Sequence, residues 1–313
     1  MTQLCLLYGA LRSGTTMLRL MLDGHPRLTC PGETDFLTDH LRPAPGTPTG
    51  WRYDLEALAA DRIFRASPAN LPETDEAEAA FADMIADLAE SAGEKGTLVL
   101  VAHRGLDRLL DLLPRMPVLH LLRDPRDVAR SAVGMGWAGN SYYGAETWLK
   151  TEAAWEASRQ RLALGQVHTL RYESLVRQPE AELGRMMDFL GLDYDTGLLT
   201  YAEHSTYDPP APDLAEQWRQ QQDQRELGLL EPRLGRLMEA RGYAASGAPA
   251  ITPGPGRRLG LWLQNKRGVW GHRIGRYGVI DPLLLAAGTR LHLAPLARGA
   301  QARIDRKKIA RLK

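Results

Sequence analysis

The chain has 313 residues, of which 44% are hydrophobic and 25% are charged. This length and apolar content suit one large globular domain, with or without an appendage, and exclude disordered and collagen-like chains. The sequence has no apolar run near the roughly 18 residues that a membrane-spanning helix requires. Its two cysteines, Cys5 and Cys30, are too few for a disulfide scaffold and indicate a reducing compartment. Because the chain begins on a strand-like segment without a visible secretory leader, we expect a cytoplasmic location.

The formal net charge of +1 conceals two regions of opposite sign. Residues 1–243 carry 25 Lys and Arg against 36 Asp and Glu, a balance of −11. Residues 244–313 carry 14 basic residues against 2 acidic ones, a balance of +12. A segment that differs so much in charge from the rest of its chain is expected to have a partner of its own, either anionic or intramolecular.

Short apolar runs alternate along the chain with longer helical patterns. Four runs are predicted to be buried strands: Leu4–Tyr8, Thr97–Ala102, Val118–Leu122 and Val167–Leu170. Helical patterns cover about residues 14–24, 104–113, 125–134, 145–164 and 179–190. The alternation predicts an α/β fold in which a parallel sheet is covered by helices on both faces.

Three further segments depart from this alternation. An insertion at about residues 35–95 opens with a Pro/Gly/Thr-rich loop, 42–50, and continues with two helical stretches, the second being the acidic Glu73–Glu90. We expect this insertion to form a lid or one wall of a cleft. Residues 244–256 have the composition of a linker. Residues 257–313 mix arginines with apolar anchors and are predicted to be a basic, partly helical C-terminal extension.

The strongest local signal is the turn after the first predicted strand. Gly9 and Gly14 have the G-x4-G spacing of a nucleotide phosphate loop, in which backbone N–H groups and a helix N-terminus hold phosphate oxygens. The lysine that would neutralise a triphosphate is replaced by Thr15, and Arg12 is the only cation in the loop. Such a loop suits an anion smaller than Mg–ATP, such as a phosphosulfate. The alternative is a strand–turn–helix whose glycines serve the turn alone.

Four sequence blocks carry a family resemblance. In chain order they are Arg12–Thr16 with Leu22–Pro26, Val118–Ser131, Leu170–Val176 with Pro179 and Asp188–Leu192, and the weaker Gln217–Arg219 with Arg241–Tyr243. Together they resemble the sulfotransferase family that uses 3'-phosphoadenosine 5'-phosphosulfate (PAPS). The resemblance implies a P-loop-like sulfotransferase fold for residues 1–243. It also implies metal-independent transfer of a sulfuryl group from PAPS to an acceptor hydroxyl, with 3',5'-ADP as the product.

By this resemblance, the loop would bind the 5'-phosphosulfate of PAPS through backbone N–H and hydroxyl groups. The residues concerned are Ser13, Gly14, Thr15 and Thr16. Arg12 would stabilise the charge that builds on the bridging oxygen as the sulfuryl group leaves. By analogy with oxyanion donors, such a group lowers the barrier by about 3–4 kcal/mol.

The second block would bind the 3'-phosphate. Arg123 and Ser131 are eight residues apart, from a strand end to the second turn of a helix, and a guanidinium with a hydroxyl suits a phosphate. The alternative is that Arg123 pairs with Asp124 or Asp127 at the helix start. Tyr172 would face the adenine by resemblance, and is otherwise a strand-end aromatic residue.

Two residues compete for the role of general base. Around Glu33 the sequence is closest to the tyrosylprotein branch of the family, whose base lies at the same offset from the loop arginine, in a Gly-Glu-Glu-Thr run. Pro31-Gly32 stands where that branch has Gly-Glu, which weakens any assignment of tyrosine as the acceptor. Bacterial carbohydrate sulfotransferases also have a glutamate base here. His103 follows a predicted strand where small-molecule branches have a catalytic histidine. We favour Glu33 over His103.

Two other classes of protein are alternatives. A P-loop nucleotide kinase or NTPase would need an atypical phosphate loop, and the missing lysine argues against it. A non-catalytic nucleotide-binding scaffold would use its basic tail to hold nucleic acid or membrane. Nucleic acid is not expected as a partner, because the basic residues lie in one appendage and no reading motif is present.

The acceptor and the role of the tail stay open at the level of sequence. Carbohydrates, lipid headgroups, peptide tyrosines and metabolites all provide hydroxyl acceptors for this donor chemistry. The basic tail is expected to dock on the acidic body or on a sister subunit of a homodimer. The alternative is peripheral contact with an anionic membrane.

Overall fold

The computed structural model describes residues 3–91, 93, 95–291 and 293–309. The chain forms two compact units. Unit 1 consists of the chain up to Val128 together with Thr147–Gln222 and Leu234–Ala245. Unit 2 consists of Ala129–Glu146, Asp223–Arg233 and the chain from Ser246 onward. Each unit therefore gathers segments that lie far apart in the sequence.

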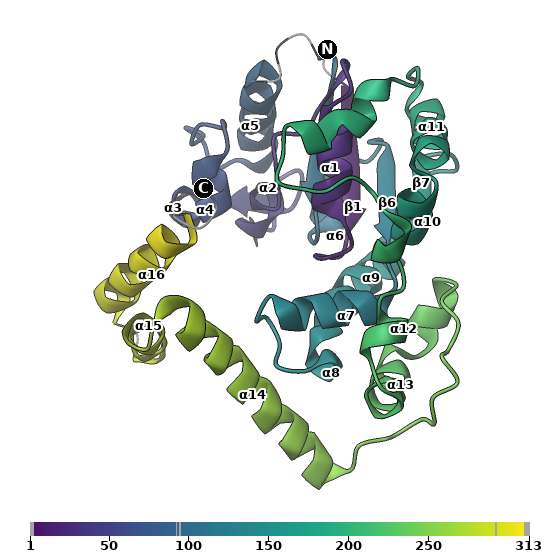
Figure 1. The fold of residues 1–313 in the computed structure, drawn as a ribbon. Coiled ribbons are helices and arrows are strands. Elements are labelled where there is room, and N and C mark those ends of the chain that lie inside the picture. The colour runs from purple at the N-terminus through teal and green to yellow at the C-terminus, as the bar shows by residue number, and fades with distance from the viewer. Residues whose placement is uncertain (1–2, 92, 94, 292, 310–313) are drawn as a thin grey trace. The chain divides into compact units, whose positions relative to one another are not determined.

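Unit 1 is built on a parallel sheet (Figure 1). The strands are β1 (Gln3–Gly9), β2 (Leu28–Thr29), β5 (Thr97–Ala102), β6 (Val118–Leu122) and β7 (Val167–Arg171), in the spatial order β2-β5-β1-β6-β7. All neighbouring pairs in it are parallel. The four predicted strands are present. The edge strand β2 has only two residues, too few to show a periodic pattern, so the sequence does not predict it.

Alternate residues of the central strands belong to two apolar cores, one on each face of the sheet. Cys5 and Leu7 of β1 pack in the first core, and Leu6 and Tyr8 pack in the second. The first core is completed by α1 (Thr15–Asp23), α10 (Tyr172–Arg177) and α11 (Pro179–Leu190). The second is completed by α5 (Ala77–Ser91) and α6 (Leu106–Leu112). The predicted α/β fold with helices on both faces is confirmed.

The segment predicted as an insertion consists of short elements. They are α2 (Phe36–Asp39), β3 (Leu41–Pro43), β4 (Trp51–Tyr53), α3 (Leu55–Ala60) and α4 (Arg62–Ala66), followed by α5. The Pro/Gly/Thr-rich stretch 42–50 proves to be mainly the connection of an antiparallel hairpin, in which Leu41 pairs with Tyr53. Three-residue strands carry too little alternation to be recognised in the sequence.

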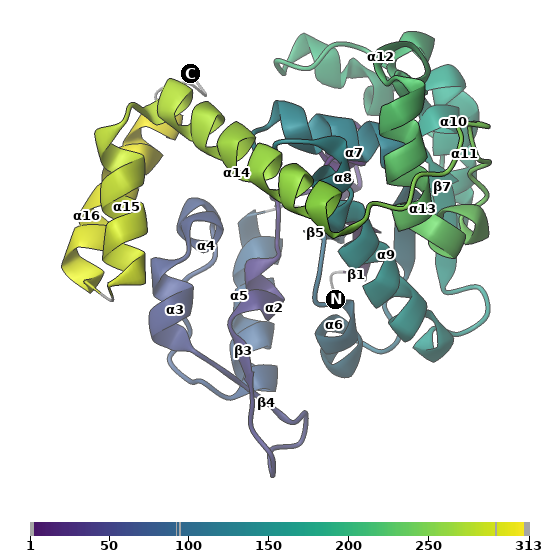
Figure 2. The ribbon, with the colours of Figure 1, turned by 90° about the horizontal axis from the view of Figure 1, so that it is seen from below.

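The remaining helices complete unit 1 and form unit 2 (Figure 2). Unit 1 also contains α12 (Trp218–Gln221). Three helices have residues in both units: α7 (Pro125–Gly134), α9 (Glu146–Ser158) and α13 (Gln224–Ala240). Unit 2 contains α8 (Ser141–Gly144), α14 (Pro255–Tyr277), α15 (Ile280–Arg290) and α16 (Ala294–Ile309). Helix α13 is interrupted at Gly235, where φ is 55°.

Helices α15 and α16 pack closely within unit 2. A Cβ on Gly288 would lie 2.7 Å from the backbone nitrogen of Ala297, so the crossing of the two helices requires a glycine. Asp281 accepts hydrogen bonds from Arg303 at 2.6 Å and from Lys307 at 2.8 Å. Over the residues that the structure describes, none of the helices is sufficiently long and apolar to cross a membrane.

Candidate active site

The phosphate loop connects β1 directly to α1. A Cβ on Gly9 would lie 2.7 Å from the carbonyl oxygen of Leu121, so the loop can pass strand β6 only with glycine at that position. Gly14 has a φ of 97° and lies against the ring of Tyr172, which a Cβ would approach to 2.3 Å. Both predicted glycines are therefore required by backbone conformation or close approach, beyond their role in a turn.

The loop contains a buried hydroxyl group that lacks a partner. Ser13 is 1% exposed, and its Oγ has no hydrogen-bond partner among the described residues. Its backbone N–H donates to the carbonyl oxygen of Ala10 at 3.0 Å. Arg12 has a φ of 75°, in the left-handed region that a non-glycine residue adopts at a cost of about 1–3 kcal/mol when held there. An unpaired buried hydroxyl in a strained loop suits a site completed by a bound oxyanion.

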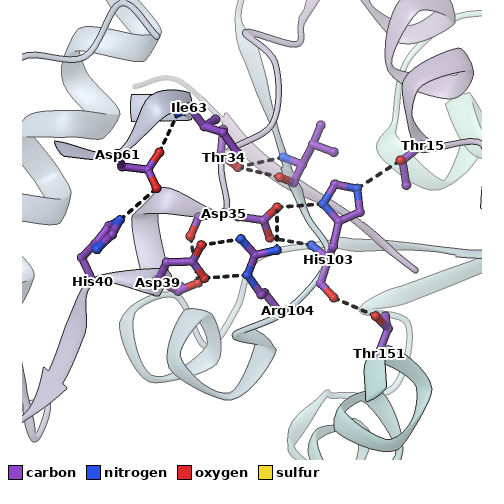
Figure 3. Close-up of polar contacts among 12 residues, drawn as sticks. Thr15, Thr34, Asp35, Asp39, His40, Asp61, Ile63, His103, Arg104 and Thr151 are labelled. Carbon is purple, nitrogen blue, oxygen red and sulfur yellow. Dashed lines mark hydrogen bonds and ion pairs between the residues drawn. The ribbon is translucent and has the colours of Figure 1, made fainter. Parts of the chain in front are cut away.

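Thr15, the first residue of α1, belongs to a chain of three buried polar side chains (Figure 3). Its Oγ1 lies 3.1 Å from Nε2 of His103, and Nδ1 of His103 lies 2.8 Å from Oδ2 of Asp35. The backbone N–H of His103 donates to Oδ1 of Asp35 at 2.9 Å. The backbone carbonyl of His103 accepts from the hydroxyl of Thr151 at 2.9 Å. The imidazole is thereby fixed on both sides.

Asp35 owes its position to the residue before it. Thr34 donates to and accepts from the backbone of Val101 in β5, with distances of 2.8–3.0 Å, and so attaches this segment to the sheet. Burial favours the protonated form of Asp35, but hydrogen bonds from His103 and the charge of Arg104 outweigh it. They lower the pKa of Asp35 below its usual value. Asp35 therefore stays a carboxylate that can only accept hydrogen bonds.

The sequence prediction does not include Asp35, because it stands at the start of the segment assigned to the insertion. A local signal was present in the run Glu33-Thr34-Asp35, which places a second carboxyl group two residues beyond the predicted base. Glu33 itself is half-buried. The ring nitrogens of His103 bond to Asp35 and Thr15, and neither bonds to Glu33.

Arg104 lies at the rim of this site. Its guanidinium donates to both carboxylate oxygens of Asp39, at 2.7 and 2.5 Å, and lies 3.6 Å from Asp35. The hydrogen bond with Asp39 is the main cause that raises the pKa of Arg104, and the charges of Asp35, Asp39 and Glu33 add to it. Arg104 is thus engaged by carboxylates around the site.

Arg123 follows the end of β6 and lies beside the loop. Its guanidinium carbon is 4.0 Å from the ring centroid of Tyr172, and its Nη1 donates to the carbonyl oxygen of Arg12 at 3.2 Å. Its buried Nε has no hydrogen-bond partner among the described residues. The structure thus brings Arg12, Gly14, Arg123 and Tyr172 together. Tyr172 is 6% exposed and packs on the loop itself.

The residues after Arg123 form a buried network in unit 1. The carboxylate of Asp124 accepts two hydrogen bonds from the guanidinium of Arg126, at 2.9 and 2.7 Å, whereas one alternative expected Arg123 to pair with Asp124. The guanidinium of Arg126 lies 3.6 Å from the ring centroid of Trp218. Glu173 accepts from the backbone N–H of Asp124 and from the hydroxyl of Tyr243. The second, third and fourth sequence blocks therefore meet at this network.

Ser131 lies within α7, among the residues that belong to unit 2, whereas Arg123 belongs to unit 1. Thr16 is half-buried in the first turn of α1. Among the described residues, the structure contains no group of three or more His, Cys, Asp and Glu side chains that could hold a metal ion.

A small cavity opens beside His103 in unit 1. Its volume is about 240 Å³, and its lining residues are Leu11, His103, Arg104, Thr147, Lys150, Thr151 and Ala154. A larger cavity of about 590 Å³ lies in unit 2 between α8, α13 and α14 and includes none of the predicted site residues. The small cavity is the one that adjoins the loop and the histidine, and it is therefore the candidate acceptor site.

Comparison with known proteins identifies the family. A model described as "Sulfotransferase family" matches residues 6–196, and the chain belongs to this family. The chain is 28% identical over 210 residues to a candidate protein-tyrosine sulfotransferase of Caenorhabditis briggsae, covering 64% of this chain and 70% of the relative. It is 27% identical over 207 residues to protein-tyrosine sulfotransferase 2 of Gallus gallus, covering 62% and 53%. The chain thus spans about half the length of the Gallus protein.

The solved structures agree with the fold. The sulfotransferase domain of the Synechococcus PCC 7002 olefin synthase superimposes with a TM-score of 0.59 at 23% identity, covering 78% of this chain and 96% of that domain. The expected sulfotransferase family, fold and enzyme class are therefore confirmed, and the protein is a sulfotransferase that transfers a sulfuryl group. The family match decides against the kinase, NTPase and scaffold alternatives.

Proposed function

We propose that this sulfotransferase takes its sulfuryl group from PAPS, transfers it to a hydroxyl group of an acceptor, and releases 3',5'-ADP. The observation that carries the proposal is the loop between β1 and α1, with the unpaired buried hydroxyl of Ser13 beside the N-terminus of a helix. This site offers N–H and O–H donors to an oxyanion and lacks the lysine of a triphosphate loop. It fits a phosphosulfate group.

Within this proposal, the chain's own residues hold the two ends of the donor. Ser13, Gly14, Thr15 and Thr16 bind the 5'-phosphosulfate, and Arg12 stabilises charge on the bridging oxygen. Two further residues complete the donor site: Arg123 binds the 3'-phosphate, and Tyr172 contacts the nucleoside. The unpaired Nε of Arg123 supports its part in this assignment, because a buried guanidinium donor without a partner suits an anionic ligand.

We assign the general base to His103 rather than to Glu33. The carboxylate of Asp35 accepts a hydrogen bond from the N–H of Nδ1 of His103. The lone pair of Nε2 is then directed at Thr15 and the phosphate loop. In the transfer, the acceptor oxygen forms its bond to sulfur, the bond from sulfur to the bridging phosphate oxygen breaks, and the acceptor proton passes to Nε2. The residues orient and stabilise this exchange without a metal.

The acceptor hydroxyl enters the cavity beside His103. With about 240 Å³, this cavity is smaller than a typical pocket of roughly 300–1,000 Å³ for a drug-sized ligand, so it takes the hydroxyl-bearing end of an acceptor. Leu11 and Ala154 give it apolar walls. Carbohydrates, lipids, peptide tyrosines and metabolites all present such an end.

A reducing compartment, the cytoplasm, fits the two cysteines. Cys5 and Cys30 are both free and buried. Burial raises the pKa of the Cys5 thiol to about 12 and that of Cys30 well above its usual value. Neither thiol is therefore reactive in the folded chain.

The proposal is tested by calorimetric titration with 3',5'-ADP and by transfer assays with PAPS and simple hydroxyl acceptors, such as p-nitrophenol, a tyrosine peptide and a disaccharide. We expect micromolar 3',5'-ADP affinity, an added 80 Da on an acceptor, and the same rate with and without EDTA. ATP with magnesium serves as the control ligand and should bind at least tenfold more weakly. Absence of 3',5'-ADP binding, or a rate that EDTA abolishes, would contradict the proposal.

A further inference from the structure

Helix α14 has two faces of different chemistry. On its inner face, the carbonyl oxygen of Leu261 accepts from the side chain of Asn140 at 2.9 Å, and Oδ1 of Asn265 accepts from the backbone N–H of Gly139 at 2.7 Å. A Cβ on Gly268 would lie 2.5 Å from Gly139, so the helix touches this segment of unit 2 closely. The inner face is therefore occupied.

The opposite face of α14 carries four apolar side chains, of which three are exposed and Trp270 is half-buried. At 100° per residue, Leu259, Leu263, Trp270 and Ile274 lie within about 40° of the direction opposite to Leu261. Leu259 is 58% exposed, Leu263 53% and Ile274 37%. We call these four residues the outer face of α14. Single exposed apolar residues are ordinary on a protein surface, but several of them on one face of a helix indicate a contact surface.

Basic side chains lie on and beside the outer face. Lys266, Arg267 and Arg273 are exposed on α14, and Nζ of Lys266 lies 5.7 Å from the ring centroid of Trp262, itself 44% exposed. Residues 255–280 contain six Lys and Arg and no Asp or Glu. A helix with tryptophan and leucine on one side, rimmed by Lys and Arg, is typical of helices that lie in the headgroup region of a membrane.

The nearest acidic residue of the extension does not weaken this positive surface. Asp281 is 6% exposed, and its carboxylate is neutralised by Arg303 and Lys307. A symmetric contact between two copies through the outer face would place the basic side chains of both helices at one interface, and like charges oppose such a contact. The charge of the face therefore favours an anionic partner.

We propose that the outer face of α14 binds the surface of a membrane that contains anionic lipids, with its apolar side chains entering the headgroup region and the basic side chains near the lipid phosphates. This binding is a second activity of the chain, and it does not depend on sulfuryl transfer. Of the alternatives for the basic tail, it is the one that uses both the apolar and the basic side chains of α14.

The test is co-sedimentation of the full chain with sucrose-loaded vesicles of phosphatidylcholine alone, or of two parts phosphatidylcholine to one part phosphatidylglycerol. We expect binding to the mixed vesicles and at least tenfold weaker binding to the neutral ones. The double variant Lys266→Gln/Arg267→Gln should bind the mixed vesicles about 25-fold more weakly, roughly fivefold per cation. The variant Leu259→Gln/Leu263→Gln should bind at least tenfold more weakly, because it removes two of the four apolar side chains of the outer face.

The matched control is Arg62→Gln/Arg65→Gln, which removes the same charge from two exposed residues of α4 in unit 1. It should bind vesicles like the unaltered chain. Equal loss in this control, equal binding to neutral vesicles, or no sedimentation at all would overturn the proposal. A dimer that the α14 variants dissociate would also overturn it, because the face would then bind a second copy. So would a melting temperature that Lys266→Gln/Arg267→Gln lowers without vesicles, because the face would then bind the acidic part of the chain.

Discussion

His103 has a defined partner for each ring nitrogen. Because a carboxylate can only accept, Nδ1 carries the proton in its bond to Asp35, and Nε2 is the nitrogen that can take a proton. Oγ1 of Thr15 lies 3.1 Å from Nε2, and Thr15 is also the residue that replaces the lysine of a triphosphate loop. At the scale of single residues, the proposed base His103 and the phosphate loop are therefore coupled through one hydroxyl.

Replacing Asp35 by asparagine tests this coupling. The amide can still accept from the backbone N–H of His103, but it no longer selects the proton position on the ring. We expect kcat to fall about 10- to 100-fold, as for other residues that orient a functional group, with 3',5'-ADP affinity unchanged. His103→Ala should lower kcat about 10²- to 10⁴-fold. Steady-state kinetics and calorimetry provide the measurements.

Asp61→Asn is the matched control. Oδ2 of Asp61 lies 3.1 Å from Nε2 of His40, so the two residues form the same kind of pair, but this pair does not contact the phosphate loop. Asparagine keeps the capping of α4, so this variant should retain its activity. If Glu33→Gln loses transfer while Asp35→Asn and His103→Ala stay active, Glu33 is the base and the assignment is wrong.

At the scale of elements, the sequence predicts well those features that depend on a few neighbouring residues. The glycines of the phosphate loop and the buried strands are of this kind. The hairpin β3–β4 is not predictable, because its strands have three residues each and its proline-rich connection has the composition of a loop. The part played by Asp35 depends on the attachment of Thr34 to β5, a contact between residues 67 apart.

Gly14→Ala tests the geometry of the loop, and Gly46→Ala is a control with the same backbone conformation. Both residues have a φ of 97°, but nothing lies within 4 Å of a Cβ on Gly46, whereas one on Gly14 would meet the Tyr172 ring. Gly46→Ala should lower the free energy of unfolding by about 1–2 kcal/mol through backbone strain. Gly14→Ala should lower it by a further 1–3 kcal/mol, about the cost of overpacking, and should weaken 3',5'-ADP binding.

Denaturant unfolding of the two variants measures the difference. If both variants lose the same stability and bind 3',5'-ADP equally, then Tyr172 does not restrict the loop, and its packing on Gly14 has no role in donor binding.

At the scale of the whole molecule, the charge division at residue 243 predicts a C-terminal extension with its own partner. In the structure, helices α14 to α16 belong to a unit that also includes Ala129–Glu146 and Asp223–Arg233. Periodicity and charge cannot reveal this grouping. It depends on contacts between residues more than 120 apart, such as the bond from Gly139 to Asn265, with a separation of 126.

Deleting residues 255–313 tests whether α14 holds the segment that follows α7. The deletion removes the acceptor of the Gly139 N–H and the carbonyl partner of the Asn140 side chain, so we expect amides of residues 136–141 to exchange with deuterium at least tenfold faster. Amides of β1 and β5 in unit 1 should keep their protection. Asn265→Ala, which removes one hydrogen bond worth about 1 kcal/mol, should speed exchange mainly at Gly139. Unchanged exchange at 136–141 in the deleted chain would show that this segment holds its conformation without α14. A general loss of protection in β1 and β5 would show that unit 1 depends on the extension for its stability.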